Sequence, residues 1–140
     1  MREMSSMSST ASAQPQAPEM APGYAVVDLE TTGLSPSADA ILEIGLVHLD
    51  ARGEIERSWT SLVDPGPGDD GAREVGPTFI HGLTPDDVTG APRIAELADL
   101  IARDLAGRVV VAHNARFDLG FLSHALGGLG MLDADAPIPQ

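Results

Sequence analysis

Two acidic side chains stand two positions apart at the end of a short apolar run. These residues are Asp28 and Glu30 in the run Tyr24–Glu30, and a turn that contains a glycine follows directly. Alternate residues of a β-strand point to the same side of a sheet, so we expect the two carboxylates to lie side by side. Neighbouring carboxylates repel each other, and a bound cation relieves that repulsion. The spacing therefore predicts a cation site, although a solvated strand end has the same sequence pattern.

A third carboxylate, Asp118, follows a second apolar run that spans residues 108–113. If the strands at 24–30 and 108–113 are parallel neighbours, the three carboxylates meet at one end of the sheet. Three such groups can hold two divalent ions about 3.5–4 Å apart, an arrangement that stabilises the attacking and leaving oxygens in phosphoryl displacement. The alternative is that Asp118 only interacts favourably with the N-terminus of its helix.

The composition limits the kind of metal and the mode of nucleic-acid binding. The chain has no cysteine, so a metal must be held by carboxylates, imidazoles or carbonyls, which suits Mg²⁺ or Mn²⁺. The formal net charge is −13, with 21 acidic and 8 basic side chains, which argues against broad electrostatic binding of a polyanion. We therefore expect weak affinity for nucleic acid without a metal ion or a partner.

Length and hydrophobicity favour a single domain with its own core, since the chain has 140 residues and is 43% hydrophobic. No apolar stretch approaches the roughly 20 residues of a membrane span, and the N-terminus lacks the apolar segment of a secretory signal. We therefore expect no membrane association and a cytoplasmic location. Residues 1–22 are rich in Ser, Ala, Pro and Gln, so we expect a disordered tail there and the folded domain at 23–140.

The hydrophobic pattern predicts the element order β-β-β-α-β-α, which defines an α/β fold with a mixed sheet flanked by helices. Pro92 suits the first position of the first helix, and Gly53 suits a hairpin turn because it tolerates positive φ. Glu43 is expected to pair structurally, and Trp59 to belong to the core. The strands are expected at 24–30, 41–49, 54–63 and 108–113, and the helices at 92–105 and 114–126.

The sequence around the three carboxylates resembles the DEDD exonucleases, the proofreading (epsilon-like) 3′–5′ exonucleases with a ribonuclease H-like fold. Val27–Gly33 (VDLETTG) and Val111–Asp118 (VAHNARFD) resemble the first two motifs of that family. Two lesser matches, Ile41–Gly45 and Ile80–Thr84, lie between them in the expected order. The resemblance covers Tyr24–Leu126, and four matches in sequence order are far more specific than one.

This resemblance implies a metal-dependent 3′–5′ exonuclease that releases nucleoside monophosphates from the 3′ end of single-stranded DNA or RNA. It implies that Asp28, Glu30 and Asp118 are the catalytic residues and hold two Mg²⁺ or Mn²⁺ ions. A DNA polymerase subunit is one partner that the family implies. The residues that would contact the substrate are Thr31, Gly33, His81 and Asn114.

The family pattern also requires a late helix with His-x₄-Asp, whose His is the general base and whose Asp is a fourth carboxylate. His113 has this spacing, but its Asp118 already belongs to the second motif. Gly82 and Pro85 interrupt a helix after His81. The sequence ends about where the family's fifth strand would begin, so we expect the C-terminal strand and helices to be missing from this partial domain. The alternative function is a non-catalytic nucleic-acid- or metal-binding remnant of that family.

Overall fold

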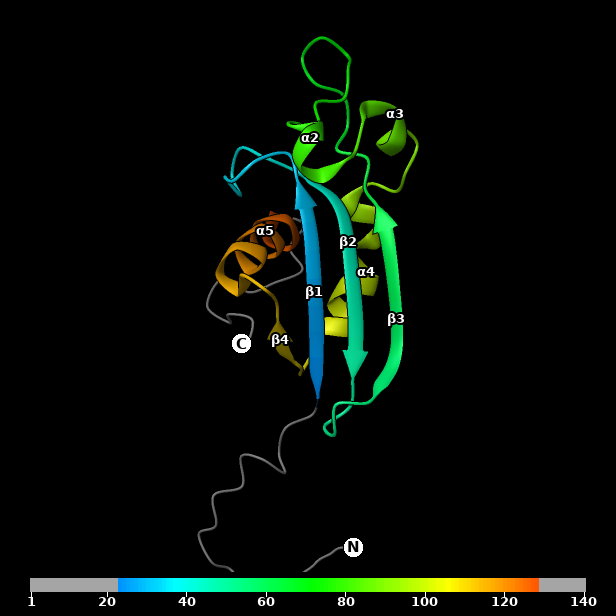
Figure 1. The fold of residues 1–140 in the computed structure, drawn as a ribbon, viewed down its shortest axis with the longest axis vertical. Coiled ribbons are helices and arrows are strands. Elements are labelled where there is room, and N and C mark those ends of the chain that lie inside the picture. The colour runs from blue at the N-terminus through cyan, green and yellow to red at the C-terminus, as the bar shows by residue number, and fades with distance from the viewer. Residues whose placement is uncertain (1–22, 129–140) are drawn as a thin grey trace, which may run out of the picture.

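A four-stranded mixed sheet forms the centre of the computed structural model, which describes residues 23–128 (Figure 1). The strands are β1 (Tyr24–Thr31), β2 (Ile41–Leu49), β3 (Ile55–Leu62) and β4 (Val109–Val111). Their order across the sheet is β3-β2-β1-β4. β2 is antiparallel to both β1 and β3, whereas β4 runs parallel to β1. The structure thus confirms that the strand that carries Asp28 and Glu30 and the strand that precedes Asp118 are parallel neighbours.

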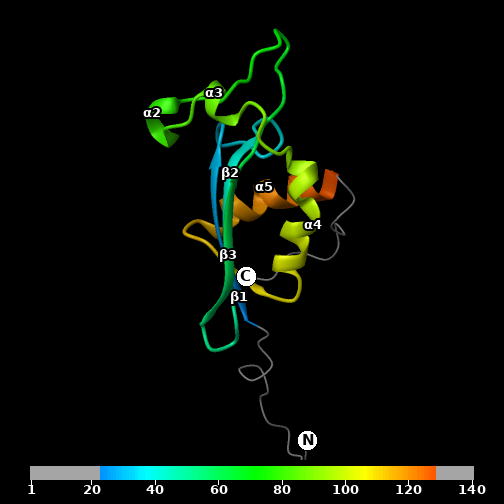
Figure 2. The same cartoon turned by 90° about the vertical axis from the view of Figure 1, so that its right-hand side faces the viewer.

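Two helices pack on the same side of the sheet and form the core with it (Figure 2). Alternate residues of the central strands, such as Val27 and Leu46, point toward these helices and are buried. Leu97 and Ile101 of the first helix are four residues apart, so they form one apolar stripe that packs against the strands. Leu122 of the second helix is buried in the same core. The helix bounds are Ile94–Leu105 for α4 and Ala115–Gly128 for α5.

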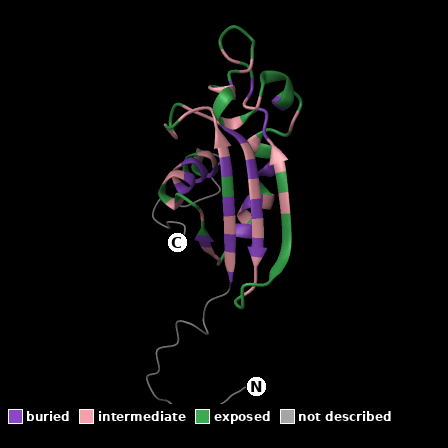
Figure 3. Ribbon diagram, viewed as in Figure 1, coloured by how far each residue is buried: buried purple, intermediate pink, exposed green. Residues whose placement is uncertain are grey.

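The other face of the sheet is covered by neither α4 nor α5. Buried and more accessible residues alternate along β1 and β2 (Figure 3), and Asp28 belongs to the accessible set. In the sheet register Asp28 lies opposite Gly45, which in turn lies opposite Thr60. A shallow groove follows this row and is lined by Val26, Asp28, Gly45, Leu46, Val47, Ser58, Trp59 and Thr60. The acidic residues of β1 therefore face an open surface.

Buried Asp64 organises the long segment between β3 and α4. Its carboxylate accepts hydrogen bonds from the backbone N–H groups of Gly66 and Gly90 and from the guanidinium of Arg73. These hydrogen bonds lower the pKa of Asp64, the one from Arg73 most. The segment contains two single helical turns, α2 (Thr78–His81) and α3 (Pro85–Val88).

A second buried carboxylate, Asp104, joins α4 to β3. Its side chain is fully buried and accepts hydrogen bonds from Arg57 and Trp59 of β3 and from the neighbouring Arg103. Burial by itself would raise the pKa of Asp104, but these three donors outweigh it and lower the pKa to about 2. Trp59 packs against the core, as predicted.

Several boundaries differ from the sequence-based expectation. The helix expected at Pro92 begins at Ile94, because the Glu96 side chain accepts the backbone N–H of Arg93 and fixes the helix start there. The fourth strand is only Val109–Val111, shorter than residues 108–113, since that is the length over which it pairs with β1. The turn at Gly53 has a φ of 86°, as expected.

Other expectations fall partly or wholly beyond the described structure. The disordered tail expected at residues 1–22 lies outside residues 23–128, as does the chain after α5. Among the helices of the described part, none is both long and apolar enough to cross a membrane.

Candidate active site

Asp28 and Glu30 lie on the accessible face of β1, as their spacing predicts. Burial raises the pKa of Glu30 above its ordinary value, and the negative charges of Asp28 and Glu43 raise it further. His81 acts in the opposite direction and lowers it. Glu43 of β2 stands directly opposite Glu30 in the sheet register and has no ion-pair partner within residues 23–128. The structural pairing expected for Glu43 is therefore not found there, and Glu43 adds negative charge to the site.

Asp118 lies in the first turn of α5 and is buried, with 6% of its surface accessible. Burial raises the pKa of Asp118 to about 6, and the charge of Asp28 contributes to this rise. His113, in the loop before α5, partly opposes it. Asp28 thus lies within electrostatic reach of both Glu30 and Asp118, because the parallel pairing of β1 and β4 delivers the start of α5 to the β1 edge.

The donor chemistry of this group fits a hard divalent cation. All the candidate ligands are carboxylate oxygens, which Mg²⁺ and Mn²⁺ prefer. Burial is the main cause of the raised pKa values of Glu30 and Asp118, and the charge of Asp28 adds a repulsion that a cation would relieve. As the side chains lie, however, no three His, Asp or Glu residues within 23–128 are close enough together to hold a metal ion. Closing the site therefore requires side-chain rotation or further ligands.

His81 is fixed by hydrogen bonds at both ring nitrogens. Its Nε2 lies 2.6 Å from the carbonyl oxygen of Val75, and the backbone N–H of Leu83 donates to Nδ1 over 3.0 Å. Because a carbonyl oxygen can only accept, Nε2 carries the proton and Nδ1 is the acceptor. Both ring nitrogens are therefore occupied, and His81 has no free lone pair with which to remove a proton from water.

The other substrate-contact residues implied by the resemblance lie in the loops around the carboxylates. The Thr31 hydroxyl donates to the carbonyl of Gly33 over 2.6 Å and closes the turn after β1. A side chain at Gly33 would displace the carboxylate of Asp39. Asn114 is exposed, and its carbonyl accepts the backbone N–H of Asp118 at the start of α5.

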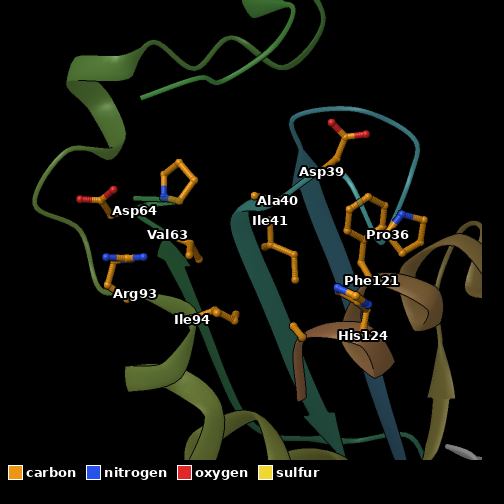
Figure 4. Close-up of a pocket in the computed structure, with 12 residues that line it drawn as sticks. Pro36, Asp39, Ala40, Ile41, Val63, Asp64, Arg93, Ile94, Phe121 and His124 are labelled. Carbon is orange, nitrogen blue, oxygen red and sulfur yellow. The ribbon is translucent and has the colours of Figure 1, made fainter. Parts of the chain in front are cut away.

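A cavity of about 200 Å³ lies elsewhere, between the β1–β2 loop and helices α4 and α5 (Figure 4). Its lining includes Asp39 of the loop, Arg93 before α4 and His124 of α5. None of the three predicted carboxylates lines it. This cavity is thus separate from the group formed by Asp28, Glu30 and Asp118.

Sequence reasoning missed the residues that position the site. Asp64 and Asp104 organise the flanking segment and the α4–β3 contact, but their partners lie up to 47 positions away. A short-range signal existed only for Asp64, because an Asp followed by Pro and Gly is typical of a turn in which the Asp side chain accepts a backbone N–H. Glu43 adds negative charge beside Glu30 because of the register between β1 and β2, which could not be read from the sequence.

Comparison with known proteins assigns the chain to a family. The sequence model of the exonuclease family RNase_T matches residues 25–138. The fold and the sequence together define an exonuclease domain of ribonuclease H-like architecture. The chain belongs to the RNase_T exonuclease family, and the DEDD resemblance is thereby confirmed.

Among the similar proteins are DNA polymerase III epsilon and epsilon-like subunits that are longer than this chain. The chain is 38% identical over 103 residues to DNA polymerase III subunit epsilon of Treponema pallidum, a match that covers 74% of this chain and 46% of that protein. It is 40% identical over 101 residues to a DNA polymerase III subunit epsilon-like protein of Rhodobacter capsulatus, covering 71% of this chain and 14% of that protein. The chain therefore spans less than half the length of these relatives.

Solved structures of exonuclease I share the fold. The apo form superposes with a TM-score of 0.66 at 20% identity, covering 76% of this chain and 25% of that one. A zinc-bound form of the E. coli enzyme with single-stranded DNA gives the same score and identity, covering 76% and 24%. At 20% identity this similarity shows that the two proteins share a fold, the mixed sheet with helices packed on it.

Proposed function

We propose that this chain is a metal-dependent exonuclease domain that removes nucleotides from the 3′ end of DNA or RNA. The observation that carries the proposal is the parallel pairing of β1 with β4, which brings the start of α5 with Asp118 to the strand that carries Asp28 and Glu30. Membership of the RNase_T family supports the same reaction. A DNA polymerase subunit is the partner that the epsilon-like relatives suggest.

In this proposal Asp28, Glu30 and Asp118 hold Mg²⁺ or Mn²⁺ through their carboxylate oxygens. When bound, two such ions would supply an activated water at neutral pH and stabilise the charge on the departing 3′ oxygen. The fold determines the side from which the nucleic acid would approach, because the carboxylates of β1 face the open side of the sheet. Thr31 and Gly33, at the end of that strand, would lie beside the terminal nucleotide.

A second function has a specific observation in its favour. Within residues 23–128 no three acidic or histidine side chains are arranged to hold a metal ion, and both nitrogens of His81 are occupied. These facts favour, between the two alternatives to catalysis, a domain that binds nucleic acid without hydrolysing it. General acid–base help is typically worth about 10²–10⁴-fold in rate, so a domain without a base would be a poor catalyst.

One assay separates the two functions. A single strand labelled at its 5′ end is incubated with the purified chain and Mn²⁺, and shortening from the 3′ end is followed. The exonuclease proposal expects successive loss of single nucleotides, which stops in EDTA and in Asp28→Ala. Absence of shortening, or equal shortening by Asp28→Ala, would overturn it, the second result by identifying a contaminating nuclease.

A further inference from the structure

His48, near the end of β2, is a buried histidine that takes no part in the candidate active site. Only 3% of its side chain is accessible, and it lies opposite buried Ala25 in the sheet register. Arg108, the residue before β4, donates from its Nε to the His48 Nε2 over 2.9 Å. Because a guanidinium can only donate, Nε2 carries no proton while this hydrogen bond exists, and the ring proton is on Nδ1.

Glu56 of β3 places a negative charge beside the other ring nitrogen. Its Oε1 lies 2.9 Å from the His48 Nδ1 and 3.5 Å from the Arg108 Nη2. The contact with Nδ1 is an ion contact rather than an aligned hydrogen bond, and Nδ1 has no hydrogen-bond partner within residues 23–128. A carboxylate at this distance favours the charged form of a histidine, whereas a guanidinium disfavours it. Protonation of His48 is therefore favoured by Glu56 and opposed by Arg108.

The other charged side chains near His48 are engaged with one another. They form a group between β3 and α4: Arg57, Arg103 and Asp104. Arg57 lies opposite His48 in the sheet register, but its guanidinium binds the Asp104 carboxylate. Glu56 and Arg108 are therefore the charged groups that respond directly when His48 gains a proton.

Arg108 connects the start of β4 with the rest of the sheet. Its guanidinium passes close to Gly23, where a side chain would collide with it. The next residue, Val109, donates its backbone N–H to the Gly23 carbonyl over 3.1 Å and begins the pairing with β1. Figure 1 shows that β1 and β4 begin and β2 ends at this end of the sheet. Because β4 has only three residues, the contacts of Arg108 add substantially to what holds it in register.

We propose that His48 is a pH-dependent latch that holds β4, and through β4 the start of α5 with Asp118. A proton taken from solvent by Nε2 removes the acceptor of Arg108 and puts two positive charges on groups 2.9 Å apart. Glu56 then holds the protonated ring, Arg108 turns away, and the short pairing of β4 with β1 opens more often. Histidine changes its charge between pH 5 and 8, so the latch responds near neutral pH. The latch itself requires neither metal nor nucleic acid.

Amide hydrogen exchange measured by NMR in EDTA at pH 7.5 and pH 5.5 tests the latch. Protection factors correct for the intrinsic effect of pH on exchange. We expect the protection factor of the Val109 amide to fall at least about tenfold at pH 5.5 relative to the amides of β2, in line with the loss of a hydrogen bond from a charged donor. The nitrogen shifts of the His48 ring should show a proton on Nδ1 alone at pH 7.5 and on both nitrogens at pH 5.5.

His48→Gln should keep the latch closed, because the Gln carbonyl can accept from Arg108 but takes up no proton. Its Val109 amide should be equally protected at both pH values. His124→Gln is the matched control, since His124 is exposed on α5, and it should keep the pH dependence of the wild type. Glu56→Gln removes the charge that holds the protonated ring, so the loss of protection should move to lower pH.

The latch is overturned if the wild-type Val109 amide is equally protected at both pH values, if the His48 ring keeps a single proton at pH 5.5, or if His48→Gln shows the wild-type pH dependence. An equal loss of protection in β2 would also overturn it, because that result is global unfolding rather than opening of β4. If His48→Gln does not fold, Glu56→Gln decides, and an unchanged midpoint overturns the latch.

Asp118 also takes up a proton in this pH range, but it does so in every variant, so the comparison of variants isolates His48. The measurements use no nucleic acid, so the latch and the proposed function fail in different experiments.

Discussion

The Asp118 carboxyl group, a proposed metal ligand, lowers the stability of the fold that holds it. Its pKa is raised to about 6, above the ordinary 3.8 of an aspartic acid, so the folded state favours the protonated form. Above pH 6 the group is ionised in both states, and its ionisation costs the folded state about 3 kcal/mol. At pH 3 the group is protonated in both states and costs nothing.

We therefore expect Asp118→Asn to stabilise the metal-free chain at pH 7.5 and to raise its melting temperature by at least about 4 °C. Thermal unfolding in EDTA measures this, and the gain should shrink as the pH falls from about 6 to about 4. A variant that melts at the same temperature as the wild type at pH 7.5 would show that Asp118 is not strained by burial and by Asp28.

At this scale the sequence predicted part of the candidate site. Asp28, Glu30 and Asp118 could be named because strand alternation and parallel pairing act over short, regular distances. Glu43 could not be placed next to Glu30, because register depends on how β1 and β2 slide past each other. The double hydrogen bonding of His81 also escaped the sequence, since its partner Val75 is a backbone carbonyl in an irregular segment.

At the scale of elements, the contact between α4 and β3 depends on the single buried carboxylate of Asp104. Its pKa is lowered to about 2, so it contributes stability that is fully present above its ordinary pKa and is lost as the pH falls toward 2. We expect Asp104→Asn to cost about 2 kcal/mol of unfolding free energy at pH 7, because Arg57 and Arg103 lose their charged acceptor.

Urea denaturation at pH 7 and at pH 3 measures this effect. The difference between the wild type and Asp104→Asn should be smaller at the lower pH, because at pH 3 the Asp104 carboxyl group is mostly protonated in the unfolded chain while it is still mostly ionised in the folded one. Asp99→Asn is the control, since Asp99 lies exposed on the same helix and has no such partners within the described residues. Equal losses for both variants would contradict the role of Asp104.

The sequence predicted which strands and long helices exist better than it predicted where each of them begins and ends. The apolar stripe of α4 and the alternation of β1 follow from packing against one core, which dominates such patterns. The start of α4 is decided instead by one hydrogen bond from Arg93 to Glu96, which outweighs the preference of Pro92 for a first turn. The turns α2 and α3 are too short to show a helical period in the sequence.

For the molecule as a whole, the net charge of −13 and the group of carboxylates make metal ions the expected source of stability. We expect millimolar Mn²⁺ or Mg²⁺ to raise the melting temperature of the wild-type chain, because a ligand that binds only the folded state stabilises it by mass action. Asp28→Ala should show little or no rise, since it lacks the carboxylate that couples to both others.

Differential scanning calorimetry with and without metal measures this rise in melting temperature for the wild type and for Asp28→Ala. Addition of Na⁺ at equal ionic strength serves as the control for general screening of the negative surface. An equal rise in the wild type and in Asp28→Ala would show that the ion acts on surface charge rather than at the three carboxylates.

The parallel pairing of β1 with β4 has a consequence for the order in which the molecule folds. The meander β1–β2–β3 closes through short loops, whereas Tyr24 must find Val109 from nearly the other end of the described chain. Loop closure over that distance carries a larger entropy cost, so β4 docks after the meander has formed. Asp28 and Glu30 would consequently be in place before Asp118 arrives, and the repulsion between Asp28 and Asp118 would arise only in the last step. A metal ion bound at that moment would accelerate the step that completes the sheet.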